Sequence, residues 1–245
     1  SYARSSGQPR RLILDPWIVG TVAALLLIGL VMVASASIGI SEKETGHAFH
    51  YFQRQLLYVL AGLVAAGIGL AVPTRIWEEY SVYLLGGAFL LLVVVLIPGI
   101  GYEVNGARRW IRLGFMNFQV SEAARVMLLM YVASYAVRRS EELRSDFKGF
   151  MTPVGVLAAA AVLLLCEPDF GAATVLFATG LGVLFLAGAR VLHLLVPIVL
   201  GSAALGTLAV ISPYRLRRLT GFLDPWGDPF NSGFQLVQSL IAIGR

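Results

Sequence analysis

The most polar stretch beside an apolar run lies at residues 103–125. There, Arg108, Arg109 and Arg112 surround Trp110. A guanidinium group donates hydrogen bonds in a fixed fork that matches two phosphate oxygens. The segment therefore predicts recognition of a phosphate-bearing ligand. The alternative is an interfacial anchor, in which Trp110 and the arginines contact lipid head groups.

A second candidate is Glu122 with Arg125, three residues apart in an otherwise apolar stretch. On a helix this spacing places both side chains on one face. Each charge would cost about 2.5–3.5 kcal/mol at the centre of a membrane on insertion scales. We therefore expect the two to pair or to face a water-filled cavity. A functional cavity and a structural ion pair near the helix end both account for the pattern.

The third candidate is Asp169, in the polar break CEPDFGAAT at residues 166–174. Pro168 disfavours a helix that continues through Glu167. Asp169 is placed to cap the next helix by accepting hydrogen bonds from free backbone N–H groups. Capping alone would explain this aspartate. The alternative is a carboxylate that faces a cavity.

Metal or ion chemistry has little support in the sequence. Asp224 and Asp228 lie in DPWGDP, but aspartate before proline is usual in turns. His47 and His50 have a metal-like spacing, but two ligands do not complete a site. The sequence has no P-loop, GxSxG or HExxH motif, which disfavours an ATP-driven pump and a serine or zinc protease of known motif. We assign no metal ligand.

The elements that position these residues must lie in a membrane. The 245 residues are 58% apolar and only 13% charged, whereas a soluble domain is about 25% charged. The single cysteine excludes a disulfide scaffold within the chain. The composition predicts a polytopic membrane protein.

We expect an all-α bundle of seven transmembrane helices. A helix needs about 20 mostly apolar residues to cross the hydrocarbon. Six stretches satisfy this without a charge, and a seventh contains Glu122 and Arg125. The seven predicted spans are 16–41, 55–74, 81–102, 119–138, 149–166, 170–189 and 191–214.

Lysine and arginine do not fix the orientation, because nine fall on each side of the predicted membrane. The first loops favour an N-terminus inside, with residues 1–15 as a cytoplasmic tail. Residues 213–245 are then extracytoplasmic. Leu216, Leu219 and Phe222 share a helical stripe there, which predicts an amphipathic segment lying on the membrane.

Three blocks of the sequence resemble one protein family. GARRWIRLGFMNFQVSEAAR is similar to the GxxRWIxLGxxxxQPSExxK signature of the SEDS proteins (shape, elongation, division and sporulation). EPDFG is similar to that family's QPDLG, and DPWGDPFNSG resembles the segment that follows, in wording closest to the cell-division members. The resemblance runs from about residue 12 to residue 245 as a single transmembrane domain.

The resemblance implies a ten-helix inner-membrane protein at the division septum. It implies a peptidoglycan glycosyltransferase that polymerises lipid II outside the membrane. Its partners would be a class B penicillin-binding protein, other divisome membrane proteins and membrane lipid, but no nucleic acid. No cofactor is assigned, although a divalent cation is compatible with the chemistry. The substrate-binding residues would be Arg109, Trp110, Glu122, Arg125 and Asp169.

The chain departs from the family pattern in two ways. Val120, Arg125 and Glu167 stand where the family usually has proline, lysine and glutamine. Arg125 keeps the charge, while Glu167 adds one. The family also has about three more helices and a later motif, LPExHTDF, whose aspartate would be the catalytic base. We therefore expect a longer protein and assign no catalytic residue to this chain.

Two other functions fit the same basic outer cavity. A transporter of the lipid-linked precursor would need a path through the bundle open to both faces. A scaffold would only recruit the crosslinking enzyme.

Overall fold

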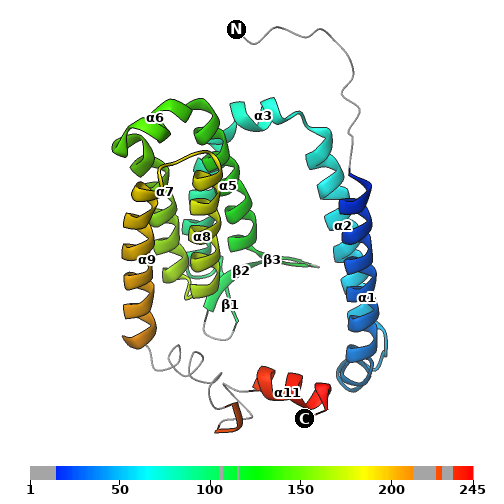
Figure 1. Ribbon diagram of the computed structural model, residues 1–245. Helices are drawn as coiled ribbons and strands as arrows, with labels where there is room; N and C mark the ends of the chain where they lie inside the picture. Colours follow the sequence, from blue (N-terminus) through cyan, green and yellow to red (C-terminus); the bar gives the residue numbers. More distant parts are fainter. Residues whose placement is uncertain (1–14, 105–106, 115, 212–224, 228–233, 245) are drawn as a thin grey trace. The chain divides into compact units, whose positions relative to one another are not determined.

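The computed structural model describes residues 15–104, 107–114, 116–211, 225–227 and 234–244. It is mainly helical and falls into two compact units, residues 1–76 and 77–245 (Figure 1). The expected cytoplasmic tail lies outside the described residues except for its last position. So do Asp224, Asp228 and the apolar stripe at 216–223. The end of the chain is described only as a 3₁₀ turn, η1 (Pro225–Gly227), and the helix α11 (Phe234–Ile243).

The first unit is built on two long helices, α1 (Pro16–Thr45) and α2 (His50–Ala71), which pack against each other. Asp15 caps α1, because its Oδ1 accepts a hydrogen bond of 2.8 Å from the backbone N–H of Trp17. The helix ends at Gly46, whose φ of +71° lies in the left-handed region that glycine tolerates. A short helix, α3 (Thr74–Glu79), follows.

Every predicted span holds one helix of the structure. In the second unit these are α4 (Ser81–Leu96), α5 (Val120–Arg138), α7 (Phe147–Cys166), α8 (Phe170–Leu186) and α9 (Val191–Ile211). Among the described residues, five helices are long and apolar enough to cross a membrane: α1, α2, α5, α7 and α9. The chain is therefore a multi-pass membrane protein. The helices α4 and α8 are shorter.

A three-stranded antiparallel sheet corrects the expectation of an all-α fold. Its strands are β1 (Tyr102–Val104), β2 (Ala107–Leu113) and β3 (Met116–Gln119), in that order. Alternate side chains of a strand point to opposite faces. Ile111 and its cross-strand partner Phe118 share one face and pack against the helical core. The alternating RRWIR sequence suits this two-faced arrangement.

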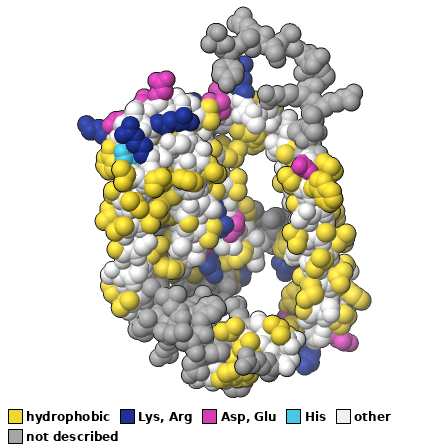
Figure 2. Space-filling view, in the orientation of Figure 1, with side chains coloured by type: hydrophobic (Ala, Val, Ile, Leu, Met, Phe, Trp, Pro, Cys, Tyr) yellow, Lys and Arg dark blue, Asp and Glu magenta, His cyan; other side chains and the backbone are white. Residues whose placement is uncertain are grey.

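The surface of the second unit is mostly apolar along its helices. Figure 2 shows hydrophobic side chains along the sides of the bundle, with charged side chains gathered over α6 (Ser140–Ser145) at one end. Exposed side chains such as Leu192, Val199 and Phe185 are apolar. Apolar side chains facing outward suit lipid, and charges at the end suit water and head groups.

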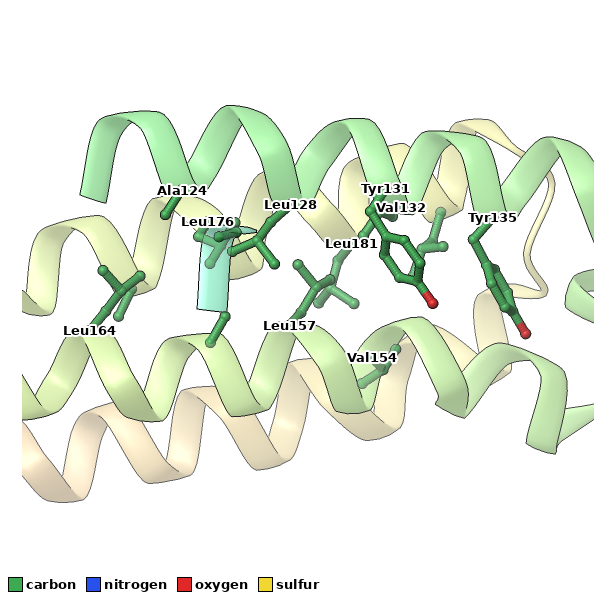
Figure 3. Packing of buried hydrophobic residues seen from close by; sticks show 14 of the residues in the cluster. Ala124, Leu128, Tyr131, Val132, Tyr135, Val154, Leu157, Leu164, Leu176 and Leu181 are labelled. Carbon is green, nitrogen blue, oxygen red and sulfur yellow. The ribbon is translucent and has the colours of Figure 1, made fainter. Parts of the chain in front are cut away.

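The core of this unit is formed by α4, α5, α7 and α8. Leu128 and Val132 of α5 meet Leu157 of α7 and Leu176 of α8, and all four are fully buried (Figure 3). Small residues let the helices approach: an added Cβ at Gly180 in α8 would lie 2.4 Å from Leu157 Cδ1. Close contacts of this kind are typical of helices packed in membranes.

This contact gives a test of the α7–α8 packing. We expect Gly180→Val to lower the free energy of unfolding by about 1–3 kcal/mol, because the new side chain overpacks a buried leucine. Gly182→Val is the matched control, since nothing lies within 4 Å of its added Cβ. Thermal unfolding in detergent would compare them. Equal destabilisation by both substitutions would contradict the packing.

Candidate functional site

Asp169 lies at the centre of the candidate site and is only 6% exposed. Its Oδ1 accepts a hydrogen bond of 3.1 Å from the backbone N–H of Ala172, which caps α8 as the sequence predicts. Its Oδ2 lies 3.5 Å from Nη1 of Arg109 and accepts a hydrogen bond of 3.3 Å from the Ser121 hydroxyl. One carboxylate therefore joins the start of α8, the sheet and the start of α5.

Arg109 is held by strand β2 on the face of the sheet that turns toward the helices. It shares this face with Ile111, two residues along the strand, which packs against the core. Besides its ion pair with Asp169, Arg109 has a buried Nε without a hydrogen-bond partner among the described residues. A guanidinium has five N–H donors, so Arg109 can bind an anionic ligand while it remains paired.

Trp110 lies on the opposite face of the sheet from Arg109, because neighbouring residues of a strand alternate. On this second face, the Arg112 guanidinium carbon lies 3.3 Å from the ring centroid of Tyr102, which pairs with Trp110 across the strands. The indole Nε1 of Trp110 is buried without a partner among the described residues. The two residues that the sequence groups together therefore contact different surroundings.

Glu122 and Arg125 form an ion pair of 2.6 Å between Oε1 and Nη2 on α5. Their side chains are 58% and 24% exposed, so the arginine is the more enclosed partner. Arg125 follows Ser121 by four residues, which places it one turn farther along the same helix face. Its Nε is also buried without a partner among the described residues.

Glu167 is a fully buried carboxyl group in the turn between α7 and α8. Neither of its oxygens has a hydrogen-bond partner among the described residues. Burial, with a smaller effect from the Asp169 carboxylate, raises the pKa of Glu167 to about 8, although Arg109 opposes the shift. The side chain is thus mainly neutral at pH 7, so the extra charge expected from the sequence is absent at that pH.

Metal binding finds no support in the part of the chain that the structure describes. It contains no group of three or more His, Cys, Asp or Glu side chains that could hold an ion, and this includes the neighbourhood of His47 and His50. The two neighbouring carboxyl groups, Glu167 and Asp169, have the Arg109 cation beside them. The charged carboxylates of the site, Asp169 and Glu122, are each paired with an arginine. The donors without a partner among the described residues include the Nε atoms of Arg109 and Arg125, which suit an anionic ligand.

Sequence reasoning missed two neutral members of the site. The Gln119 amide donates a hydrogen bond of 3.1 Å to the Ser121 hydroxyl, which in turn donates to Asp169. Ser121 is fully buried. Both residues stand within the family-like block FQVSE, but no charge marks them. Only the position of Asp169, 48 residues away along the chain, reveals their role.

The buried carboxyl group gives a prediction on pH dependence. Folded Glu167 keeps its proton up to about pH 8, whereas the unfolded chain releases it near 4.5. The folded state therefore binds more protons between these values, and stability falls as pH rises from about 4.5 to 8. We expect Glu167→Gln to reduce this pH-dependent loss of stability by about 2–4 kcal/mol. The melting temperature of the variant should therefore change less between pH 5 and pH 8 than that of the wild type.

Glu141→Gln serves as the control, because Glu141 is exposed on α6. It should leave the slope of melting temperature against pH unchanged. A wild-type melting temperature that rises from pH 5 to pH 8 would contradict a neutral buried Glu167.

Comparison with known proteins identifies the family. The family described as cell cycle protein, FtsW/RodA/SpoVE, matches residues 16–245. A probable peptidoglycan glycosyltransferase FtsW of Thioalkalivibrio sulfidiphilus is 51% identical over 94% of this chain and 58% of its own length. The protein of the same name from Halorhodospira halophila is 52% identical over 95% of this chain and 59% of its own length. The chain thus spans about three fifths of these curated relatives.

Solved structures agree with the sequence relatives. The crystal structure of the rod shape determining protein RodA of Thermus thermophilus matches with a TM-score of 0.68 and 30% identity, over 82% of this chain and 61% of that one. A chain of a peptidoglycan synthase complex, described for its coordination of polymerization and crosslinking, matches with a TM-score of 0.73 and 31% identity. That match covers 96% of this chain and 66% of the other. Sequence and structure together show that this chain belongs to the FtsW/RodA/SpoVE family of cell cycle proteins.

Proposed function

We propose that the protein containing this chain is a peptidoglycan glycosyltransferase that polymerises lipid II during septal wall synthesis. The observation that carries the proposal is the ion pair between Arg109 and the buried Asp169, which fixes a cation between the sheet and the helices. Relatives with 51% and 52% sequence identity to this chain are named as probable enzymes of this kind. In this proposal, Arg109, Trp110, Glu122, Arg125 and Asp169 form the substrate site.

The chemistry of the reaction suits the two enclosed arginines. In glycan polymerisation an acceptor hydroxyl attacks an anomeric carbon, and a lipid diphosphate leaves. Arg109 and Arg125 each carry a buried Nε donor without a partner among the described residues. We infer that both donate to the diphosphate and stabilise the charge that grows on it as the bond breaks. A base must also accept the proton of the hydroxyl, and none of the five residues is assigned that role.

The carboxylates of the site act on the arginines rather than on the sugar. Asp169 holds Arg109, and Glu122 holds Arg125. A guanidinium that is already oriented loses less freedom when it binds the diphosphate. Trp110, on the second face of the sheet, would contact a different part of the substrate, and its buried indole N–H has no partner among the described residues.

The proposal includes seven spans with the N-terminus inside. The shorter helices α4 and α8 pack against the longer α5 and α7, and a short apolar helix is accommodated in a membrane by local thinning of the bilayer and by flanking side chains that reach the interface. This arrangement places the sheet and Asp169 outside the inner membrane. The crosslinking partner would be a class B penicillin-binding protein, which would act with other division proteins at the septum.

Replacing Arg109 tests the substrate site. We expect Arg109→Ala in the full-length, membrane-inserted protein to lower lipid II polymerisation by about 100-fold, because one donor to the developing charge is lost. Trp110→Ala should also lower the amount of polymer, because a second contact to the substrate is lost. The product is measured on a gel with fluorescent lipid II. Arg190→Ala, at an exposed position outside the site, is the control. Undiminished polymer with Arg109→Ala would overturn the assignment.

The same assay distinguishes the other functions. Transfer of fluorescent lipid II across liposomes without polymer would indicate a transporter. Neither polymer nor transfer, from a folded protein supplied with its crosslinking partner, would indicate a scaffold.

A double-mutant cycle tests whether Asp169 acts by positioning Arg109. We expect Asp169→Asn to reduce polymerisation, since the amide keeps the α8 cap but loses the charge that holds Arg109. If the two act as a unit, Arg109→Ala with Asp169→Asn will be no less active than Arg109→Ala alone. Fully additive losses would show that Asp169 acts separately.

A further inference from the structure

A pocket lined by charged side chains lies among α4, α5, α6 and α7, away from Asp169. Its volume is about 690 Å³. Arg138, Arg139 and Lys148 line it, together with two carboxylates, Glu142 and Asp146. None of these residues belongs to the site proposed above.

The pocket is at the opposite end of the membrane-spanning bundle from the proposed site. Ser121 stands at the start of α5 and Arg138 at its end. The two residues are 17 positions apart, which corresponds to about 25 Å along a helix. This length is close to the thickness of the hydrocarbon. Figure 2 shows charged side chains gathered at this end, over α6. The pocket therefore opens where phospholipid head groups lie.

Two of the three cations are available to a ligand. Arg139 is bound to Glu142 through contacts of 2.8 and 3.0 Å. Arg138 and Lys148 have no ion pair among the residues that the structure describes, and both are exposed. Asp146 is also unpaired in the described chain and opposes an anion. The pocket thus offers two free positive charges against one negative charge.

The floor of the pocket is formed by buried side chains that make specific contacts. Tyr131 and Tyr135 are buried to 9% and 7% exposure, and their rings lie 6.3 Å apart. The Tyr135 hydroxyl donates a hydrogen bond of 2.8 Å to the Gly149 carbonyl, which ties α5 to α7. An added Cβ at Gly149 would lie 2.6 Å from the carbonyl oxygen of Glu142, so α6 closes tightly over this point.

We propose that this pocket binds the phosphate head group of an anionic membrane phospholipid, with Arg138 and Lys148 as its charged contacts and Tyr131 at its floor. Basic pockets between membrane helices bind such head groups. The volume exceeds that of a phosphate ion alone and accommodates a phosphoglycerol group. The inference does not depend on the glycosyltransferase activity.

The test uses the full-length protein in a neutral detergent with short-chain phosphatidylglycerol, and native mass spectrometry measures binding. We expect Arg138→Gln with Lys148→Gln to weaken binding by about 10-fold or more, because each cation near a lipid charge contributes substantially. Asp146→Asn should strengthen binding, since it removes the opposing charge. Phosphatidylcholine of the same chain length should bind weakly to all variants.

Matched controls keep the result specific. Arg190→Gln removes a positive charge from an exposed position outside the pocket and should leave the affinity within twofold. Tighter binding of inorganic phosphate than of phosphatidylglycerol would assign the site to a soluble phosphate ligand and overturn the proposal, whereas tighter binding of the lipid supports it. The proposal is wrong if the double variant binds as tightly as the wild type, or if Arg190→Gln weakens binding equally. If the double variant does not fold, Asp146→Asn decides, and unchanged affinity overturns the proposal.

Discussion

The buried carboxylate of Asp169 is the constraint on which the end of the bundle that carries the sheet depends. A charge that is 6% exposed must be paired and hydrogen-bonded, or it costs several kcal/mol. Its oxygens are satisfied by three elements at once: the backbone of α8, Arg109 of β2 and Ser121 of α5. The need to satisfy one side chain therefore fixes where the sheet stands against the helices.

The lipid environment explains why the polar groups gather at the two ends of the bundle, around Asp169 at one end and around α6 at the other. Between them, α5, α7 and α8 contact one another through fully buried apolar residues such as Leu128, Leu157 and Leu176. Their outward faces are apolar as well. Near the end of α5, the buried hydroxyl groups of Ser134 and Ser81 satisfy each other through a hydrogen bond of 3.0 Å. Charged groups gather where water and head groups replace hydrocarbon.

The sequence predicted what depends on local pattern. The apolar runs located the helices, and the break before Asp169 located a real cap, because both follow from neighbours along the chain. The sheet was missed since β1 and β3 are short, β2 is rich in arginine, and the pairing of the three strands becomes visible only in three dimensions. The role of Ser121 was missed because its partner Asp169 is distant in sequence. The neutral state of Glu167 was missed because it depends on burial, which is decided by the packing of the whole bundle.

The alternation of β2 has a consequence for how the chain can change over evolution. Arg109 and Ile111 lie on one face of the strand, while Trp110 and Arg112 lie on the other, and the short hairpin at Gly114 sets the pairing of Ile111 with Phe118. Inserting or deleting a single residue in this strand would exchange its two faces. An indole would then stand beside the Asp169 carboxylate. Single substitutions along β2 leave its two faces in place, whereas a change in the number of its residues does not.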